Sequence, residues 1–506
     1  MSLMLELGRK PDTRSQAFFR FREVAGKFVV TSIDGSYVVL EREEMIAFAE
    51  GRVERGTPLW QRLCDASLLR SELDAGRVAE RLRQRLGFIH AGPNLHMLVV
   101  TLRCNETCVY CHASRADMDA THTDMTADIA EKAVDLALST TSPWVTLEFQ
   151  GGEPLVNFPI VQHAIQYAQR KNESIGKTLE LTMVSNLSLM DDAKLEWLIA
   201  NKVQICTSVD GPEHLHDKQR KLPGFSAHKS TVESVRRINQ AYEKIGLDTQ
   251  MYRVEALLTT TRDTLPRWKD VVDTYVALGC RALFLRPVDP FGFMDKTAPK
   301  VEYPRAEYLA FYRSAVDYMI QLNMQNVQIL ERYAAIFLTK ILTGADPNFL
   351  DIRSPGGAGI GAIAYNWNGK IFSSDEGRML HERGDDTFQI GDVRTSTYRD
   401  LVGHETVRAE VIASLRDAQP DCVNCAYNPY CGVPPVYSHK AQGTLWGRMR
   451  DNPLCAVHKG IQDYLFGKII ENDPATMEVL RRWTTSRART HFLHEPGGIS
   501  VASGRA

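Results

Sequence analysis

The feature that most constrains this chain is a group of three cysteines, Cys104, Cys108 and Cys111, spaced C-x3-C-x2-C. Residues 96–102, just before them, form an apolar, β-branched stretch that predicts a buried strand. The cysteines therefore follow the carboxyl end of a strand, where α/β barrels place their catalytic groups. Three soft thiolates suit a [4Fe–4S] cluster and would leave one iron open to a substrate or cofactor. A zinc loop or a group of reduced buried thiols is the alternative.

Strand and helix patterns alternate from residue 96 to about residue 290, as βα units around a parallel sheet do. The expected strands are 96–103, 144–149, 179–184, 203–209, 252–258 and 282–285. The expected helices are 126–139, 160–171, 192–200, 230–245 and 264–278. An α/β domain with polar strand ends facing one cavity follows from this alternation.

Small and polar residues follow three of these strands. They are Gly151, Gly152, Glu153 and Pro154 after the second strand, Ser185 and Asn186 after the third, and Ser208, Asp210 and Arg220 after the fourth. Glycines let the backbone approach a ligand closely, and Glu153 can accept hydrogen bonds from an ammonium group. The hydroxyl, amide and carboxylate groups can bind ribose, and Arg220 can pair with a carboxylate. Turn formation is the alternative for Asp210 and the Gly-Pro pair after it.

A second cysteine cluster lies near the C-terminus. It consists of Cys422, Cys425, Cys431 and Cys455. Proline, glycine and asparagine interleave with these cysteines, which predicts a site built from loops. Four thiolates saturate a [4Fe–4S] cluster, so this site would serve electron transfer or structure. A four-cysteine zinc site is the alternative.

The first 90 residues predict a small separate unit. Residues 27–33 and 36–40 read as strands joined at Asp34-Gly35, and helical patterns cover 41–50, 58–69 and 75–86. Residues 1–16 are polar and expected to be loose. The unit carries no cluster of metal-ligating or acid–base residues, so we expect it to bind a partner or to cap the barrel.

Composition excludes several functional classes. The net charge is −2, which gives no electrostatic case for binding nucleic acid or an anionic membrane. No apolar run approaches the roughly 18 residues of a membrane helix, and the start of the chain lacks the pattern of a signal peptide. Seven of the ten cysteines fall in the two clusters, which is typical of metal ligands in a reducing compartment, so we expect a cytoplasmic protein.

The C-x3-C-x2-C loop with Tyr110 before its last cysteine, followed by Gly151-Gly152-Glu153-Pro154 after the second strand, resembles the radical S-adenosylmethionine (SAM) enzymes. The resemblance implies a partial (β/α)6 barrel whose cluster binds SAM at its open iron and generates a 5′-deoxyadenosyl radical. It also implies that SAM is bound by Tyr110, by the GGEP residues and by Ser185, Asn186, Ser208, Asp210 and Arg220.

The C-terminal cysteines resemble the SPASM extension of peptide-modifying radical SAM enzymes, which holds two auxiliary clusters. Gly356, Ser374 and Pro435 stand where the ligands of the first auxiliary cluster are expected, whereas Cys422, Cys425, Cys431 and Cys455 match those of the second. The resemblance therefore implies one auxiliary [4Fe–4S] cluster. It also makes Asp375 a candidate catalytic base, with a solvated acidic turn as the alternative.

Over residues 17–470 the chain is most similar to the His-Xaa-Ser system radical SAM maturases. The resemblance implies a winged-helix-like leader-peptide module (1–93), a barrel (94–300), a helical bridge (301–350), a SPASM-like domain (351–470) and a C-terminal helix and tail (471–506). It implies oxidative crosslinking of a ribosomal precursor peptide, with a second paired radical SAM protein and a reductant such as flavodoxin or ferredoxin. A non-catalytic iron–sulfur protein that binds peptide for a paired maturase is the alternative.

Overall fold

The computed structural model describes residues 15–247 and 253–485. Most of the segment expected to be loose at the N-terminus, and the tail after residue 485, lie outside these ranges. None of the helices in the described ranges is both long enough and apolar enough to span a membrane.

A nine-stranded sheet, in the order β12-β10-β8-β7-β6-β4-β14-β15-β16, organises the molecule. Its first six strands are all parallel to their neighbours. They are β4 (Leu95–Thr101), β6 (Trp144–Gly151), β7 (Thr178–Val184), β8 (Val203–Ser208), β10 (Glu255–Thr260) and β12 (Leu285–Pro287). Five of the six expected strands are confirmed, although residue 252, where the fifth was expected to begin, lies outside the described residues. The sixth is split, because Ala282 and Leu283 form β11, which pairs with β13 (Leu330–Glu331) outside the main sheet.

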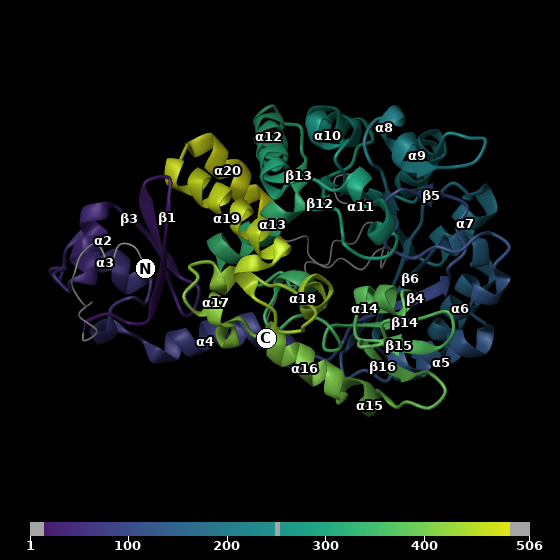
Figure 1. Cartoon of the computed structure of the whole chain (residues 1–506), viewed down its shortest axis with the longest axis horizontal. Coiled ribbons are helices and arrows are strands. Elements are labelled where there is room, and N and C mark those ends of the chain that lie inside the picture. Colours follow the sequence, from purple (N-terminus) through teal and green to yellow (C-terminus); the bar gives the residue numbers. More distant parts are fainter. Residues whose placement is uncertain (1–14, 248–252, 486–506) are drawn as a thin grey trace.

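Helices cover one face of the parallel strands (Figure 1). They are α5 (Ala127–Leu138), α6 (Phe158–Ile175), α7 (Asp192–Ala200), α9 (Ala227–Lys244) and α10 (Trp268–Ala277). In β6 the side chains of Val145, Leu147 and Phe149 are fully buried in the core that α5 and α6 share with the sheet. The alternate residues Thr146 and Glu148 are only half-buried, because a strand turns successive side chains to opposite faces. On β6, the face turned away from these helices therefore carries polar side chains.

Residues after 350 extend this same sheet. β14 (Ala362–Tyr365) pairs in parallel with β4, and β15 (Lys370–Phe372) and β16 (Gln389–Asp392) continue it in antiparallel pairing. The pairing is reinforced by a hydrogen bond of 3.0 Å between His96 Nδ1 and the Tyr365 hydroxyl. The start of the C-terminal region thus lies beside β4, the strand that leads into the loop of the first cysteines.

The N-terminal unit is a three-stranded antiparallel sheet with its own core. The expected hairpin is confirmed as β2 (Lys27–Ser32) and β3 (Tyr37–Leu40), and the expected helices as α2 (Arg42–Ala49), α3 (Pro58–Asp65) and α4 (Ala75–Leu86). β1 (Phe19–Val24), to which the sequence analysis assigned no element, pairs with β2. Figure 1 shows this unit at one end of the molecule, beside α17 (Pro420–Val423) and α19 (Pro453–Glu471).

The bridge consists of α12 (Arg305–Met324) and α13 (Arg332–Leu338), which pack against α19 and α20 (Pro474–Trp483). A helical pattern covers residues 327–342 of the sequence, but the α-helix in the structure is shorter. The Glu331 carboxylate accepts a hydrogen bond of 2.7 Å from the Ala334 amide, so α13 begins after Glu331, and a π-helical turn over Thr339–Thr343 ends it.

Candidate functional site

The three N-terminal cysteines lie on the loop that follows β4, as expected. The root of this loop is fixed by Arg103, which pairs with Asp124 through Nε–Oδ1 and Nη2–Oδ2 contacts of 2.8 and 2.5 Å. The Thr101 hydroxyl donates a third hydrogen bond of 2.6 Å to the same carboxylate. Bidentate pairing of this kind fixes direction as well as position, so the loop leaves the sheet at a defined angle.

Gly151 and Gly152, at the end of β6, pack directly against this root. A Cβ atom on Gly151 would lie 2.1 Å from the Thr101 carbonyl oxygen, and one on Gly152 would lie 2.3 Å from that of Arg103. The amide of Gly152 donates to Thr101 O at 2.8 Å, and that of Glu153 to Arg103 O at 2.8 Å. The glycines thus let two backbone segments approach each other closely. Close approach of a ligand to the same backbone stays a prediction.

The Glu153 carboxylate joins the ends of β6 and β7. It is fully buried and accepts hydrogen bonds from the amides of Leu155 and Asn186 and from the Ser185 hydroxyl, at 2.9, 2.7 and 2.8 Å. Burial raises the pKa of Glu153 to about 7, although these three donors oppose the rise. A carboxylate offers about four lone-pair sites, so one remains for a further donor. Pro154 follows it and opens the short helix over Pro154–Asn157.

Asn186 connects the end of β7 to the cysteine loop. Its Nδ2 atom lies 3.8 Å from Cys104 Sγ and 3.1 Å from the side-chain oxygen of Asn105. Its own side-chain oxygen accepts from Ser188, and Asn105 also donates to the Ser188 hydroxyl. This closed network holds an N–H group against the first thiol.

A two-stranded strap holds the middle of the cysteine loop. β5 (Thr107–Cys108) pairs with β9 (Arg220–Lys221), which follows the short helix α8 (Glu213–Gln219). The register sets Cys108 opposite Arg220, whose Nη1 atom lies 3.7 Å from the sulfur. Arg220 is a residue predicted from the sequence, whereas its pairing with Cys108 is visible only in the structure.

Asp210 anchors Arg220 and Tyr110. Its carboxylate is fully buried, accepts from Arg220 Nε at 3.0 Å, and accepts a short hydrogen bond from the Tyr110 hydroxyl. The Arg220 guanidinium also lies 5.3 Å from the centre of the Tyr110 ring, within cation–π range. The three predicted residues are thus brought together, and as placed Arg220 is engaged by Asp210. Ser208, the last residue of β8, is half-buried beside them and pairs with Leu257 in the ladder.

Glu106, between the first two cysteines, was missed by the sequence analysis. It is 1% exposed, and its Oε1 atom has no hydrogen-bond partner among the described residues. Burial raises the pKa of Glu106 to about 7. Burial and the nearby Glu153 raise the pKa of Cys104 to about 12, and burial raises that of Cys108 despite Arg220. Thiols in such a place ionise only when a cation or metal cluster binds them.

Asp375 begins α14 (Asp375–His381), and Ser374 caps that helix through a hydrogen bond of 3.1 Å from the Gly377 amide. The Asp375 carboxylate accepts from Arg378 Nε at 2.7 Å. Arg378, which is 1% exposed, also donates to the Ala113 carbonyl at 3.2 Å. A buried guanidinium therefore connects Asp375 to the segment just after Cys111.

The three positions without the expected cysteines share one cavity. Gly356, Ser374 and Pro435 all line it, together with Glu376 and Glu410. Gly356 is bonded through its amide to the Ser414 hydroxyl at 2.9 Å. Residues distant in sequence thus converge as the resemblance implied, and of the three positions only Ser374 has a polar side chain, a hydroxyl.

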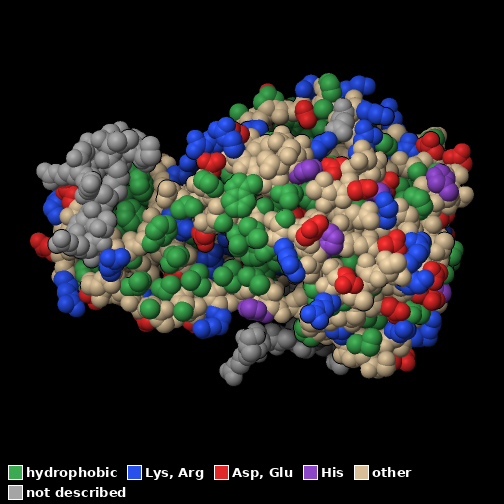
Figure 2. All heavy atoms as spheres, turned by 60° about the horizontal axis from the view of Figure 1, so that its bottom comes forward, with side chains coloured by type: hydrophobic (Ala, Val, Ile, Leu, Met, Phe, Trp, Pro, Cys, Tyr) green, Lys and Arg blue, Asp and Glu red, His purple; other side chains and the backbone are tan. Residues whose placement is uncertain are grey.

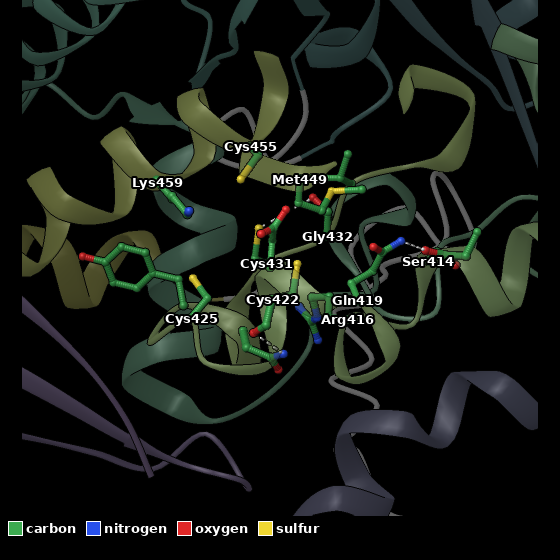
Figure 3. A pocket seen from close by; sticks show the side chains of 15 residues that line it. Ser414, Arg416, Gln419, Cys422, Cys425, Cys431, Gly432, Met449, Cys455 and Lys459 are labelled. Carbon is green, nitrogen blue, oxygen red and sulfur yellow. Dashed lines mark hydrogen bonds between the residues drawn. The ribbon is translucent and has the colours of Figure 1, made fainter. Parts of the chain in front are cut away.

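The four C-terminal cysteines line a single cavity between α17 and α19, with Arg416 and Lys459 (Figure 3). Burial raises the pKa of Cys422 to about 12 and also raises the pKa values of Cys431 and Cys455. Two buried nitrogens of Arg416, Nε and Nη1, have no hydrogen-bond partner in the described part of the chain. Four thiols and an unpaired cation around one cavity fit an anionic metal–thiolate centre.

Neither group of cysteines surrounds a position suited to a single metal ion. Nowhere in residues 15–247 and 253–485 do three or more His, Cys, Asp or Glu side chains adopt an arrangement suited to one metal ion.

Comparison with known proteins agrees with this picture. The model of the radical SAM superfamily matches residues 98–251. The cysteine-type anaerobic sulfatase-maturating enzyme of Clostridium perfringens (strain 13) is 21% identical over 388 residues, which cover 75% of this chain and 98% of that enzyme. An uncharacterised protein of Methanocaldococcus jannaschii is 24% identical over 189 residues, 37% of this chain and 60% of that protein.

Two solved structures share the fold. Native anSMEcpe with bound AdoMet aligns with a TM-score of 0.62 and 18% identity, over 77% of this chain and 99% of that one. SuiB of Streptococcus suis bound to precursor peptide SuiA aligns with a TM-score of 0.51 and 13% identity, over 87% of this chain and 98% of that one. The parallel strands, the cysteine loop and these matches show that the chain carries a radical SAM domain and is related to anaerobic sulfatase-maturating enzymes.

Proposed function

We propose that this chain is a radical SAM enzyme that modifies a ribosomally made precursor peptide, with repeated His-Xaa-Ser units as substrate and an oxidative crosslink as product. The observation that carries the proposal is the geometry around the cysteine loop. Asn186 and Arg220 direct N–H groups to the sulfurs of Cys104 and Cys108, at 3.8 and 3.7 Å. Donors of this kind orient and stabilise thiolates that bind a metal cluster.

In this proposal Cys104, Cys108 and Cys111 hold the catalytic [4Fe–4S] cluster. The cluster and SAM would supply a carbon-centred radical that abstracts hydrogen from the peptide. The remaining lone-pair site of Glu153 and the neighbouring carbonyls would accept the SAM ammonium. Ser208 would face its ribose, while Ser185 would act by holding the Glu153 carboxylate in place. Asp375, held toward the cysteine loop by Arg378, would accept the substrate proton.

The C-terminal site would hold one auxiliary cluster on Cys422, Cys425, Cys431 and Cys455. Four thiols fill every iron of such a cluster, so it would receive an electron and not bind substrate. A reductant of the flavodoxin or ferredoxin class would reduce the catalytic site, and a second, paired radical SAM protein would act on the same peptide.

The N-terminal module supports a peptide substrate. Its three-stranded sheet ends at β3, and an extended leader peptide could add to such an edge as a further strand. SuiB, which shares the fold of this chain, was solved with a precursor peptide bound. Leader binding to the 1–93 segment is therefore part of the proposal.

The test uses the full chain, reconstituted anaerobically with iron and sulfide, with SAM, dithionite and a synthetic peptide of leader and His-Xaa-Ser repeats. A crosslink removes two hydrogen atoms, which mass spectrometry resolves. We expect Cys104→Ala to abolish the mass change and Cys64→Ala, a half-buried cysteine outside both clusters, to leave it.

Three outcomes would contradict the proposal. Full modification by Cys104→Ala would remove the catalytic role from this chain. SAM cleavage with an unchanged peptide would reject the His-Xaa-Ser substrate. Bound iron without SAM cleavage would favour the non-catalytic peptide-binding protein.

A further inference from the structure

The cavity of the C-terminal cysteines is lined by two cationic side chains, Arg416 and Lys459. Figure 3 shows them on opposite sides of the group formed by Cys422, Cys425, Cys431 and Cys455. The one carboxylate in the lining, Asp421, is paired with Arg450 at 2.8 Å. The charge offered to an occupant of this cavity is therefore positive.

Burial of the Arg416 guanidinium costs free energy unless an anionic group lies next to it. Its Nε and Nη1 atoms are buried and have no hydrogen-bond partner among the described residues. Burial lowers the pKa of Arg416 to about 10, which leaves it charged at neutral pH. A buried cation needs a counter-charge, and an ionised Cys431 would act on Arg416 more strongly than Asp346 or Asp417 does.

Lys459 approaches from α19, one turn after Cys455. Its ammonium group opposes the effect of burial on the pKa of Cys455, through its charge and a side-chain hydrogen bond, and it acts on Cys422 as well. Two independent elements, the 3-10 turn over Arg416–Ala418 and α19, thus each deliver one cation to the thiols.

The first cysteine loop has the opposite surroundings. Glu106 and Glu153 are buried beside Cys104, and Arg220 is paired with Asp210. Where they are ionised, these carboxylates offset the positive charge of Arg220 at the thiols. Nearby positive charge and N–H donors stabilise the more negative, reduced form of an iron–sulfur cluster, whereas buried carboxylates destabilise it.

We propose that Arg416 and Lys459 hold the reduction potential of the C-terminal cluster above that of the cluster at Cys104, Cys108 and Cys111. The charge asymmetry then makes the C-terminal site the electron acceptor of the pair. This inference rests on the proposed function, because it requires iron–sulfur clusters at both cysteine sites.

The test is a potentiometric titration of the anaerobically reconstituted full chain, without peptide, followed by EPR. SAM is added to identify the signal of the barrel site, since the saturated site has no open iron. We expect the C-terminal cluster to be reduced at the higher potential.

Arg416→Gln and Lys459→Gln should each move the C-terminal potential lower, and the double variant should move it further. Arg416→Lys should restore most of the shift caused by Arg416→Gln. Arg408→Gln, an exposed arginine on α16 (Glu405–Ser414), changes net charge equally and should move neither signal.

Several results would overturn the inference. One is a double variant that retains its iron and has the same C-terminal reduction potential as the unaltered chain. Another is a barrel site that is reduced at a higher potential than the C-terminal site. A third is loss of iron from both single variants while the fold stays intact. Zinc at the C-terminal cysteines of the unaltered chain would remove its premise. Because the titration needs no peptide, failure here is separate from failure to modify one.

Discussion

Gly152 illustrates how closely the segments around the candidate site pack at the residue scale. An alanine Cβ there would lie 2.3 Å from one backbone oxygen and 2.4 Å from another, and backbone cannot rotate away as a side chain can. We expect Gly152→Ala to cost about 1–3 kcal/mol of unfolding free energy, as overpacking does, and to reduce iron bound by the barrel site. Urea unfolding and iron analysis measure the two effects.

Gly467 is the matched control for this prediction. It lies inside α19, and an added Cβ would meet nothing within 4 Å. Gly467→Ala should raise the unfolding free energy by up to about 1 kcal/mol through helix propensity. A Gly152→Ala variant as stable as the unaltered chain would contradict the close contact between Gly152 and the backbone after β4.

Asp210 tests the buried ion pair beside Cys108. Asp210→Asn leaves the Arg220 guanidinium, 9% exposed, without its counter-charge. Removing one partner of a buried pair costs about 3–5 kcal/mol. Urea unfolding at neutral pH should show a loss of this order. The Asp192 side chain is 95% exposed in its pair with Arg237, so Asp192→Asn should change the unfolding free energy by less than about 0.5 kcal/mol. Similar losses of stability in both variants would refute the special role of Asp210.

The residues of the candidate site could be predicted because their types and spacing are typical of metal and cofactor binding. Cys104, Cys108, Cys111 and the GGEP run stand out by type and position alone. Their partners did not, because the contacts of Arg220 and Asn186 with the thiols join segments about 80 to 110 residues apart. Glu106 stands between two of the cysteines in the sequence, but its burial depends on tertiary contacts that the local sequence does not reveal.

At the scale of elements, α16 carries Glu410, a buried acid in the cavity of the missing cysteines. Burial raises the pKa of Glu410 to about 8, above the ordinary 4.5, so the folded form binds its proton more tightly than the unfolded form. Its contribution to stability is therefore complete below about pH 4.5 and is lost as pH rises toward 8, by up to about 1.4 kcal/mol per pH unit.

Glu410→Gln keeps the side chain neutral and removes this pH dependence. We expect the variant to match the unaltered chain near pH 5 and to exceed its unfolding free energy near pH 8.5, measured by urea unfolding at both values. Glu405→Gln, exposed in the first turn of the same helix, should not change the pH profile. A Glu410→Gln profile parallel to that of the unaltered chain would show that Glu410 does not titrate as the cavity implies.

Regular elements were predicted from local pattern, and irregular ones were not. The parallel strands and their helices have strong hydrophobic periodicity, so most of their positions were correct. β5 and β9 are two residues long and exist only because they pair with each other, and β14 joins the barrel because its register against β4 buries Ala362 and Ala364. Such pairings between distant segments leave no periodic signal in the sequence.

At the scale of the whole molecule, the N-terminal module is bonded to the loop of the C-terminal cysteines. Arg20 donates to Val423 O at 2.7 Å and pairs with Asp417, and the Thr31 hydroxyl donates to Ala426 O at 2.9 Å. The Tyr430 hydroxyl donates to Gly35 O at 2.8 Å. Figure 2 shows hydrophobic side chains gathered along the band between the two ends of the molecule. A peptide on the module would thus lie on a body fixed to the second cysteine site.

We therefore expect Arg20→Met to loosen this loop. Amide hydrogen exchange of residues 417–430 should become faster, because a buried cation that pairs with their carbonyl and carboxylate groups is lost. Iron at the C-terminal site should fall while iron at the barrel site stays. Arg52→Met, at an exposed arginine paired within the module to Glu50, serves as control; equal exchange in both variants would show that the module does not support the loop.

The measurement that tests the central claim most directly is formation of 5′-deoxyadenosine from SAM by the reduced, reconstituted chain. It reads out the radical chemistry itself and needs no knowledge of the peptide. The account predicts cleavage of SAM by the unaltered chain, together with a SAM-perturbed EPR signal, and no cleavage by Cys104→Ala. Iron-loaded chain that leaves SAM intact, or a Cys104→Ala variant that cleaves it fully, would contradict the assignment of the Cys104 loop as the radical-generating site.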